Sequence, residues 1–196
     1  GRQKGAKALA EDVAGVVRAD YERRGVLVGG SVFVGNTSQG GTAPGPSGPE
    51  SFHALTTLYE AHLQFTHRGL RIRGLFAGGD IDDTEKINAA NGFTGDESVG
   101  SRLLGWYVDL GYDVLVLAAP GSGMRLVPYV RYEELDTQQK VPAGFERNLA
   151  NDQQILTAGI SFYPHSQVVL KTDYEVNRNA ANSGVNQWNL GLGYNF

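Results

Sequence analysis

Apolar and polar residues alternate without interruption along the last nine residues of the chain, 188–196. This period of two predicts a β-strand with one apolar face, formed by Trp188, Leu190, Leu192, Tyr194 and Phe196, and one face of Asn and Gly. Such a strand at the edge of a soluble domain would promote aggregation. In a transmembrane β-barrel its apolar face contacts lipid, and Trp188, Tyr194 and Phe196 lie at the membrane interface. The pattern therefore predicts the closing strand of an outer-membrane barrel.

The same alternation predicts eight earlier strands. It is clearest in residues 154–163, where Leu156, Ala158 and Ile160 alternate with Thr157, Gly159 and Ser161. In the second strand Val and Gly occupy both faces, so the sequence does not show which face is the apolar one. Pro128 in the sixth strand has no N–H and counts against a central position there. The expected strands cover about residues 13–22, 26–37, 55–66, 70–79, 102–117, 124–136, 154–163, 168–177 and 188–196.

Short and long connections alternate between these strands. Short turns contrast with long, polar or Gly- and Pro-rich loops at residues 38–53, 80–100, 137–152 and 178–184. The first loop has no periodicity of its own, and the second could contain one helical turn. In bacterial barrels the short turns are periplasmic and the long loops extracellular. The sequence thus predicts one all-β domain over residues 1–196, an antiparallel transmembrane β-barrel.

The composition agrees with this prediction. The chain has 27 Gly among 196 residues, together with 9 Tyr, 8 Phe and 2 Trp, whereas an average protein contains ~7% Gly. It has no Cys, which excludes disulfides and thiolate metal sites. No apolar run reaches the ~18 residues of a transmembrane helix. The formal net charge of −4 gives no reason to expect nucleic acid as a partner.

The odd number of strands needs an explanation, because single-chain bacterial barrels have even numbers. Either residues 1–9 hold the end of a further strand, or the chain is the C-terminal portion of a larger barrel. The chain begins with Gly1 and its only Met is Met124, which favours the second explanation and an upstream targeting segment.

Charged residues on the polar faces are the candidate functional residues. A charge facing lipid costs about 2–4 kcal/mol at mid-membrane, whereas a charge in the lumen tunes selectivity. A second interpretation is that Arg71, Arg73 and Arg131 pair with Glu60 and Glu133 as a wall network. The pore-lining candidates are His62, the basic Arg18, Arg71, Arg73, Arg131 and Lys171, and the acidic Asp20, Glu22, Glu60, Asp109, Asp113, Glu133, Asp173 and Glu175.

Metal binding and catalysis find little support in the sequence. The four His residues share no metal-ligand spacing. The acidic run at residues 80–85 lacks the sixth-position Gly of a calcium loop and is expected to be solvated. No nucleophile elbow or phosphate-binding loop is present. We therefore expect no metal, no cofactor and no enzymatic activity. Trp106, Tyr112, Tyr132 and Tyr174 are expected to face lipid or the membrane interface.

Four segments, residues 126–133, 155–165, 168–174 and 189–196, resemble the C-terminal half of bacterial porins related to the phosphate-selective porin family. The resemblance extends from about residue 16 to residue 196. It implies an outer-membrane channel, typically a homotrimer of barrels with about 16 strands, inserted by the barrel assembly machinery through the C-terminal strand. Phosphate selectivity in that family depends on an Arg and Lys ladder. Here five basic candidates face eight acidic ones, so phosphate specificity is not expected.

The leading functional hypothesis is a porin, a passive diffusion channel for small polar or charged solutes in the outer membrane of Gram-negative bacteria. The alternative is a barrel that serves as a scaffold or sheath for a partner protein. A barrel-embedded hydrolase is a third hypothesis. A soluble β-sandwich or lipocalin-like barrel is the remaining alternative for the fold, and it would bury the apolar faces that the porin exposes to lipid.

Overall fold

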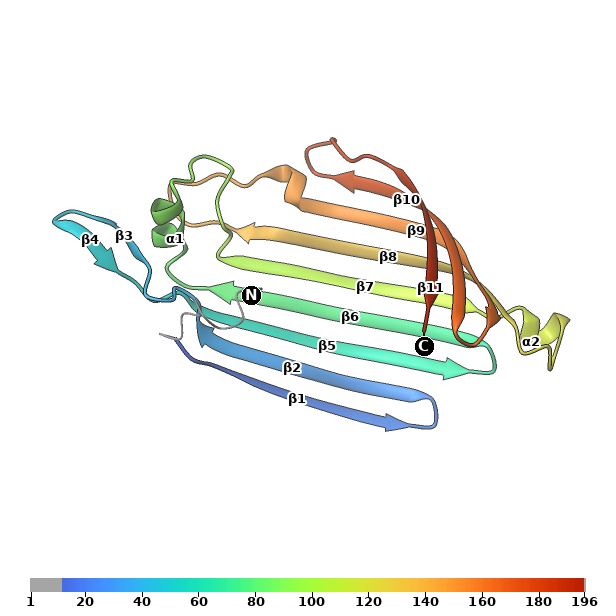
Figure 1. Ribbon diagram of the computed structural model, residues 1–196. Helices are drawn as coiled ribbons and strands as arrows, with labels where there is room; N and C mark the ends of the chain where they lie inside the picture. The colour runs from blue at the N-terminus through green and yellow to red at the C-terminus, as the bar shows by residue number, and fades with distance from the viewer. Residues whose placement is uncertain (1–11, 196) are drawn as a thin grey trace.

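A single nine-stranded antiparallel sheet dominates the computed structural model, which describes residues 12–195 (Figure 1). Each strand pairs with the strands before and after it in the chain, apart from the short β3 and β4. This confirms the all-β antiparallel class and the nine expected strands. They are β1 (Ala14–Arg23), β2 (Val26–Asn36), β5 (Leu55–His67), β6 (Leu70–Ile81), β7 (Arg102–Tyr112), β8 (Arg125–Lys140), β9 (Asp152–His165), β10 (Val168–Asn179) and β11 (Gln187–Tyr194).

The sheet curls but is not closed. Within the described residues β1 forms one edge and β11 the other, and no register joins them. In Figure 1 the strands from β9 to β11 rise out of the plane of the earlier strands, so the sheet has a concave side. Phe196 of the predicted closing strand and the candidate strand at residues 1–9 lie outside the described residues.

The connections alternate as expected, and the shortest are tight turns. Arg24 and Gly25 join β1 to β2, and Arg68 and Gly69 join β5 to β6. All four residues have positive φ, between 47° and 86°, which is the backbone of the hairpin turns that match strand twist. A Cβ on Gly25 would lie 2.2 Å from the carbonyl oxygen of Thr66, so this position also excludes a side chain for steric reasons.

The loop at residues 38–53 is more ordered than the sequence suggested. It contains a hairpin of β3 (Thr42–Gly45) and β4 (Gly48–Ser51). Phe52 and the flanking Ala43 and Ala54 form a small buried core against Ile87 of α1 (Thr84–Asn91). The hairpin escaped prediction because its four-residue strands contain Pro and Gly and have no apolar alternation. The helix α1 confirms the expected helical turn in the next loop.

The expected strand at residues 102–117 ends earlier, at Tyr112. Asp113 then accepts hydrogen bonds from the backbone N–H groups of Leu115 and Leu126, each at 3.1 Å, and stabilises a turn containing α2 (Leu115–Ala118). Pro128 counts against a central position in the sequence, yet β8 lies between β7 and β9 in the sheet. The register between β7 and β8 ends at the Gly111–Tyr129 pair, so Pro128 lies opposite no residue of β7.

The loop expected at residues 137–152 is shorter, because β8 extends to Lys140 and β9 begins at Asp152. It contains the 3-10 helix η1 (Leu149–Asn151). The buried side chain of Gln138 donates to the carbonyl oxygen of Ser98 and accepts from the N–H of Asn148 at 2.6 Å, which links two of the long loops. Among the described residues, no helix has the length and apolarity to cross a membrane.

Candidate functional site

The strand register assigns the candidate residues to one side of the sheet. Asp109 of β7 lies opposite Arg73 of β6 and Arg131 of β8, so all three side chains share a face. The same reasoning across the other strands adds Asp20, Glu60, His62, Thr157 and Asp173. We call this side the polar face. The opposite side, the apolar face, carries Val, Leu, Ile and aromatic residues, among them Leu63, Val108, Ile160, Leu170 and Leu190.

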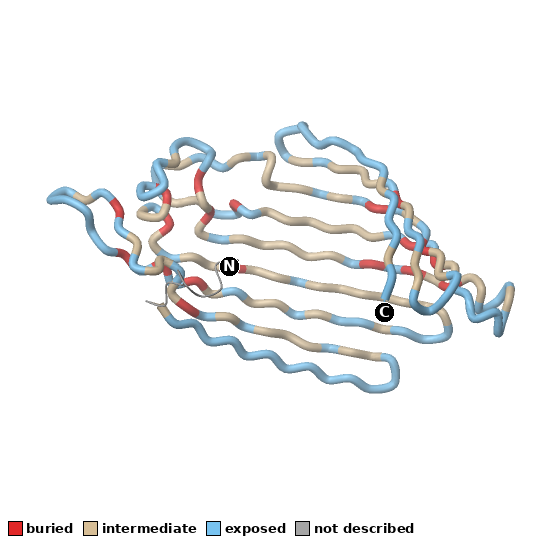
Figure 2. Tube along the Cα trace, viewed as in Figure 1, coloured by how far each residue is buried: buried red, intermediate tan, exposed pale blue. Residues whose placement is uncertain are grey.

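Burial is reversed relative to a soluble sheet. Asp109, Thr157, Ser161 and Asp173 on the polar face are buried, and Asp109 is only 1% exposed. On the apolar face Leu63 is 43% exposed, Ile160 45% and Leu190 82%. Figure 2 shows β1 exposed along its length and few buried positions in the sheet. Soluble proteins bury large aliphatic side chains and leave charges in water, so this sheet has the opposite arrangement.

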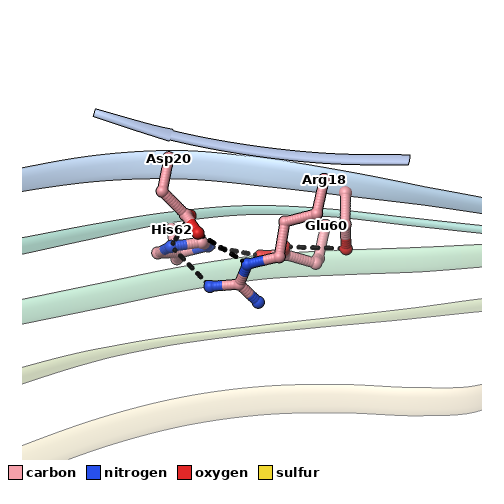
Figure 3. A network of polar contacts seen from close by, with 5 residues as sticks. Arg18, Asp20, Glu60 and His62 are labelled. Atoms are coloured by element: carbon pink, nitrogen blue, oxygen red, sulfur yellow. Dashed lines mark hydrogen bonds and ion pairs between the residues drawn. The ribbon is translucent and has the colours of Figure 1, made fainter. Parts of the chain in front are cut away.

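The first polar cluster joins β1, β2 and β5 (Figure 3). The Nε atom of Arg18 donates to the Asp20 carboxylate at 2.8 Å. The His62 ring bridges two carboxylates, with Nε2 3.0 Å from Asp20 Oδ1 and Nδ1 2.8 Å from Glu60 Oε2. Ser31 donates to the other oxygen of Glu60 at 2.9 Å. Four of the candidate residues therefore form one chain of ion pairs and hydrogen bonds.

The second cluster surrounds Asp109. Its carboxylate lies 3.1 Å from the Arg73 guanidinium and 3.5 Å from that of Arg71. Arg131 forms an ion pair with Glu133, and its guanidinium carbon lies 3.9 Å from the centroid of the Tyr107 ring. Two guanidinium groups thus contact one buried carboxylate, and Arg131 lies opposite it in the register.

The third cluster joins β8, β10 and β11. Asp173 accepts hydrogen bonds from Tyr129 at 2.7 Å and Asn189 at 2.8 Å, and forms an ion pair with Lys171 at 2.9 Å. The contact between Tyr129 and Asp173 passes over Gly159, where a Cβ would lie 2.8 Å from the Tyr129 hydroxyl. Glu175 accepts a hydrogen bond from Gln187. A hollow of about 360 Å³ separates the second and third clusters.

The wall network expected from the sequence exists, with different partners. The pairing of Arg131 with Glu133 is confirmed. The pairing of Arg71 and Arg73 with Glu60 was wrong, because both arginines lie beside Asp109. Asp113 lies beyond β7, where its carboxylate holds a turn. Tyr107, Tyr129, Ser31 and Asn189 were missed as partners, since only the register between strands reveals them.

Aromatic side chains on the apolar face lie close to one another. The ring centroids of Tyr59 and Phe76 are 6.3 Å apart, and those of Trp106 and Tyr132 are 5.6 Å apart. Trp188 on β11 lies 6.4 Å from Tyr174 on β10. These distances are typical of favourable edge or offset ring contacts. The rings therefore form a belt on the face that the sequence analysis assigned to lipid.

The other candidate chemistry of the sequence remains apart from this network. The acidic run splits, because Asp80 pairs with Arg102 at 2.7 Å and Asp83 with Lys86 at 3.2 Å. Across residues 12–195, no three His, Asp or Glu side chains are grouped in a way that could hold a metal ion.

Comparison with known proteins gives a relative whose function is not characterized. The chain is 29% identical over 181 residues to an uncharacterized protein from Aquifex aeolicus (strain VF5). The alignment covers 88% of this chain and 39% of the relative, so the chain spans about two fifths of the relative's length. No protein-family model matches the chain.

Proposed function

We propose that the chain is part of an outer-membrane porin of the kind that its sequence resembles. Its apolar face would contact lipid and its polar face would line a water-filled channel for small polar or charged solutes. One observation carries this proposal, the reversed burial of the nine-stranded sheet. Large apolar side chains without a covering layer are stable in hydrocarbon, and charges on a concave face are stable beside water.

The strand directions support closure by further strands. In an antiparallel sheet of nine strands, the first and the last run in the same direction. Pairing β11 directly with β1 would be parallel, whereas bacterial barrels are antiparallel throughout. An odd number of additional strands restores the antiparallel pattern. A barrel of about 16 strands requires 16 − 9 = 7 more, and assembly into trimers in the outer membrane belongs to the same proposal.

The lumen that we propose has mixed charge. Arg18, Arg73, Arg131 and Lys171 each pair with a carboxylate on the same face, so that the wall presents alternating signs rather than one. Rings of one charge select strongly for ions of the opposite sign. A paired wall is expected to admit small ions of either sign with weak selectivity.

Reconstitution of the full-length protein in planar lipid bilayers tests this function. We expect discrete current steps and a small reversal potential of cation-selective sign in a salt gradient, because most basic wall residues are paired and the acidic candidates outnumber the basic ones. Detergent without protein is the control for spontaneous leaks. A folded, inserted protein that conducts no ions would contradict the porin proposal. A stoichiometric protein that co-purifies with such a silent barrel would favour the sheath.

A further inference from the structure

An apolar band interrupts the polar face near the ends of the strands that carry the long loops. The register aligns Val16, Phe33 and Leu58 across β1, β2 and β5, and continues through Gly79 to Leu103 on β7. Leu135 on β8 lies beside this row, opposite Gly105. These side chains share a face with Glu60 and Asp109, and therefore lie on the polar face and not on the face assigned to lipid.

Glycines make this band hollow. A Cβ on Gly79 would lie 2.7 Å from Leu58 Cδ2 and 3.4 Å from Leu103 Cδ1, so the two leucines extend over the space that the glycine leaves. A Cβ on Gly105 would lie 3.3 Å from that of Leu135. The result is a groove of about 510 Å³ lined by Phe33, Leu58, Leu103 and Leu135. Binding pockets for small molecules commonly have such an apolar lining with few polar groups.

The charged groups at this groove are acidic. Glu60 lines it, with its two carboxylate oxygens bonded to Ser31 and His62. Asp136, the other acidic lining residue, already forms an ion pair with Arg147. No Lys or Arg belongs to the lining within residues 12–195. A ligand that fills this groove therefore meets apolar side chains along its length and a fixed carboxylate at one end.

We propose that the groove binds an amphiphilic cation. The apolar body of the ligand lies against Phe33, Leu58, Leu103 and Leu135, and its ammonium group lies beside Glu60. A carboxylate favours a cation and repels an anion of the same shape. The proposal rests on the proposed function in one respect, since an open lumen gives the ligand access to the groove.

Binding of hexyltrimethylammonium to the full-length protein in lipid nanodiscs tests the site. Titration calorimetry, with protein-free nanodiscs subtracted, should show saturable binding that weakens about fourfold for each methylene removed from the chain. Hexanoate should bind at least about tenfold more weakly because of Glu60. Glu60→Gln and, independently, Leu58→Asn should each weaken binding of the cation by about tenfold. Glu85→Gln, on the exposed side of α1, is the matched control and should leave the affinity unchanged.

Each outcome separates this site from the porin proposal. Equal affinity for hexanoate, or an unchanged affinity in the folded Glu60→Gln and Leu58→Asn proteins, would overturn the site. Absence of saturable binding would also overturn it. Saturable binding to a protein that conducts no ions would support the site while contradicting the channel. Conductance without binding would support the channel while contradicting the site.

Discussion

Replacing Leu63 by Arg is expected to lower the free energy of unfolding in lipid by about 2–4 kcal/mol, the cost of a basic side chain on the lipid face near mid-membrane. Leu63 lies near the middle of β5 on the apolar face and is 43% exposed. The neighbouring Gln64 is also exposed but points to the polar face. Gln64→Arg should therefore be tolerated. Urea unfolding of both variants in lipid vesicles measures the difference.

This pair of variants tests whether the apolar face contacts lipid or water. Gln64→Arg places a second basic side chain opposite Arg73, whose charge is balanced by Asp109. It is therefore a demanding control, because it adds the same charge as Leu63→Arg and also lies beside another arginine. If the apolar face contacted water, an exposed Leu63 could be replaced by Arg at a cost within about 0.5 kcal/mol. Equal stability of the two variants would contradict contact with lipid.

Replacing Asp109 by Asn is expected to change both stability and ion selectivity. The buried carboxylate contacts Arg71 and Arg73, and Arg131 lies opposite it in the register. Its loss leaves basic groups without their partner, at a cost of about 1–3 kcal/mol. The wall also gains positive charge, so the permeability ratio of chloride to potassium should rise. Reversal potentials in a potassium chloride gradient measure this ratio.

Glu175→Gln is the matched control for Asp109→Asn. Glu175 lies on the same face and loses the same charge, but its partner is the neutral Gln187 and not a guanidinium group. We expect a smaller change in stability for this variant. If Asp109→Asn left the reversal potential unchanged in a conducting protein, the cluster around Asp109 would not face the ion path.

Most of the sheet could be predicted from the sequence, because each strand carries its own evidence. In β9 the alternation of Leu156, Ala158 and Ile160 with Thr157, Gly159 and Ser161 defines both the strand and its two faces. The Arg-Gly turns at residues 24–25 and 68–69 likewise mark the hairpins locally. The β3–β4 hairpin and α2 were missed because their stability depends on contacts made elsewhere, with α1 and through Asp113.

The partners within the polar face were harder to predict than the face itself. Alternation assigns Arg71, Arg73 and Glu60 to the same side, but only the register determines that Asp109 lies beside the two arginines. The groove was missed for a related reason. Leu58 interrupts the polar pattern of its strand, and Phe33 lies in a strand whose two faces the sequence does not distinguish. Neither residue indicates a groove until the sheet aligns both with Leu103.

Site-directed spin labelling along β5 tests the central claim most directly, since the chain has no Cys to remove. Labels at alternate positions should differ in accessibility, measured with oxygen in lipid and with a water-soluble nickel chelate. We expect oxygen access at Ala61, Leu63 and Phe65, and nickel access at His62, Gln64 and Thr66. Labels at Ala61, Leu63 and Phe65 that are shielded from both reagents, or that the nickel complex reaches, would contradict a lipid-facing sheet.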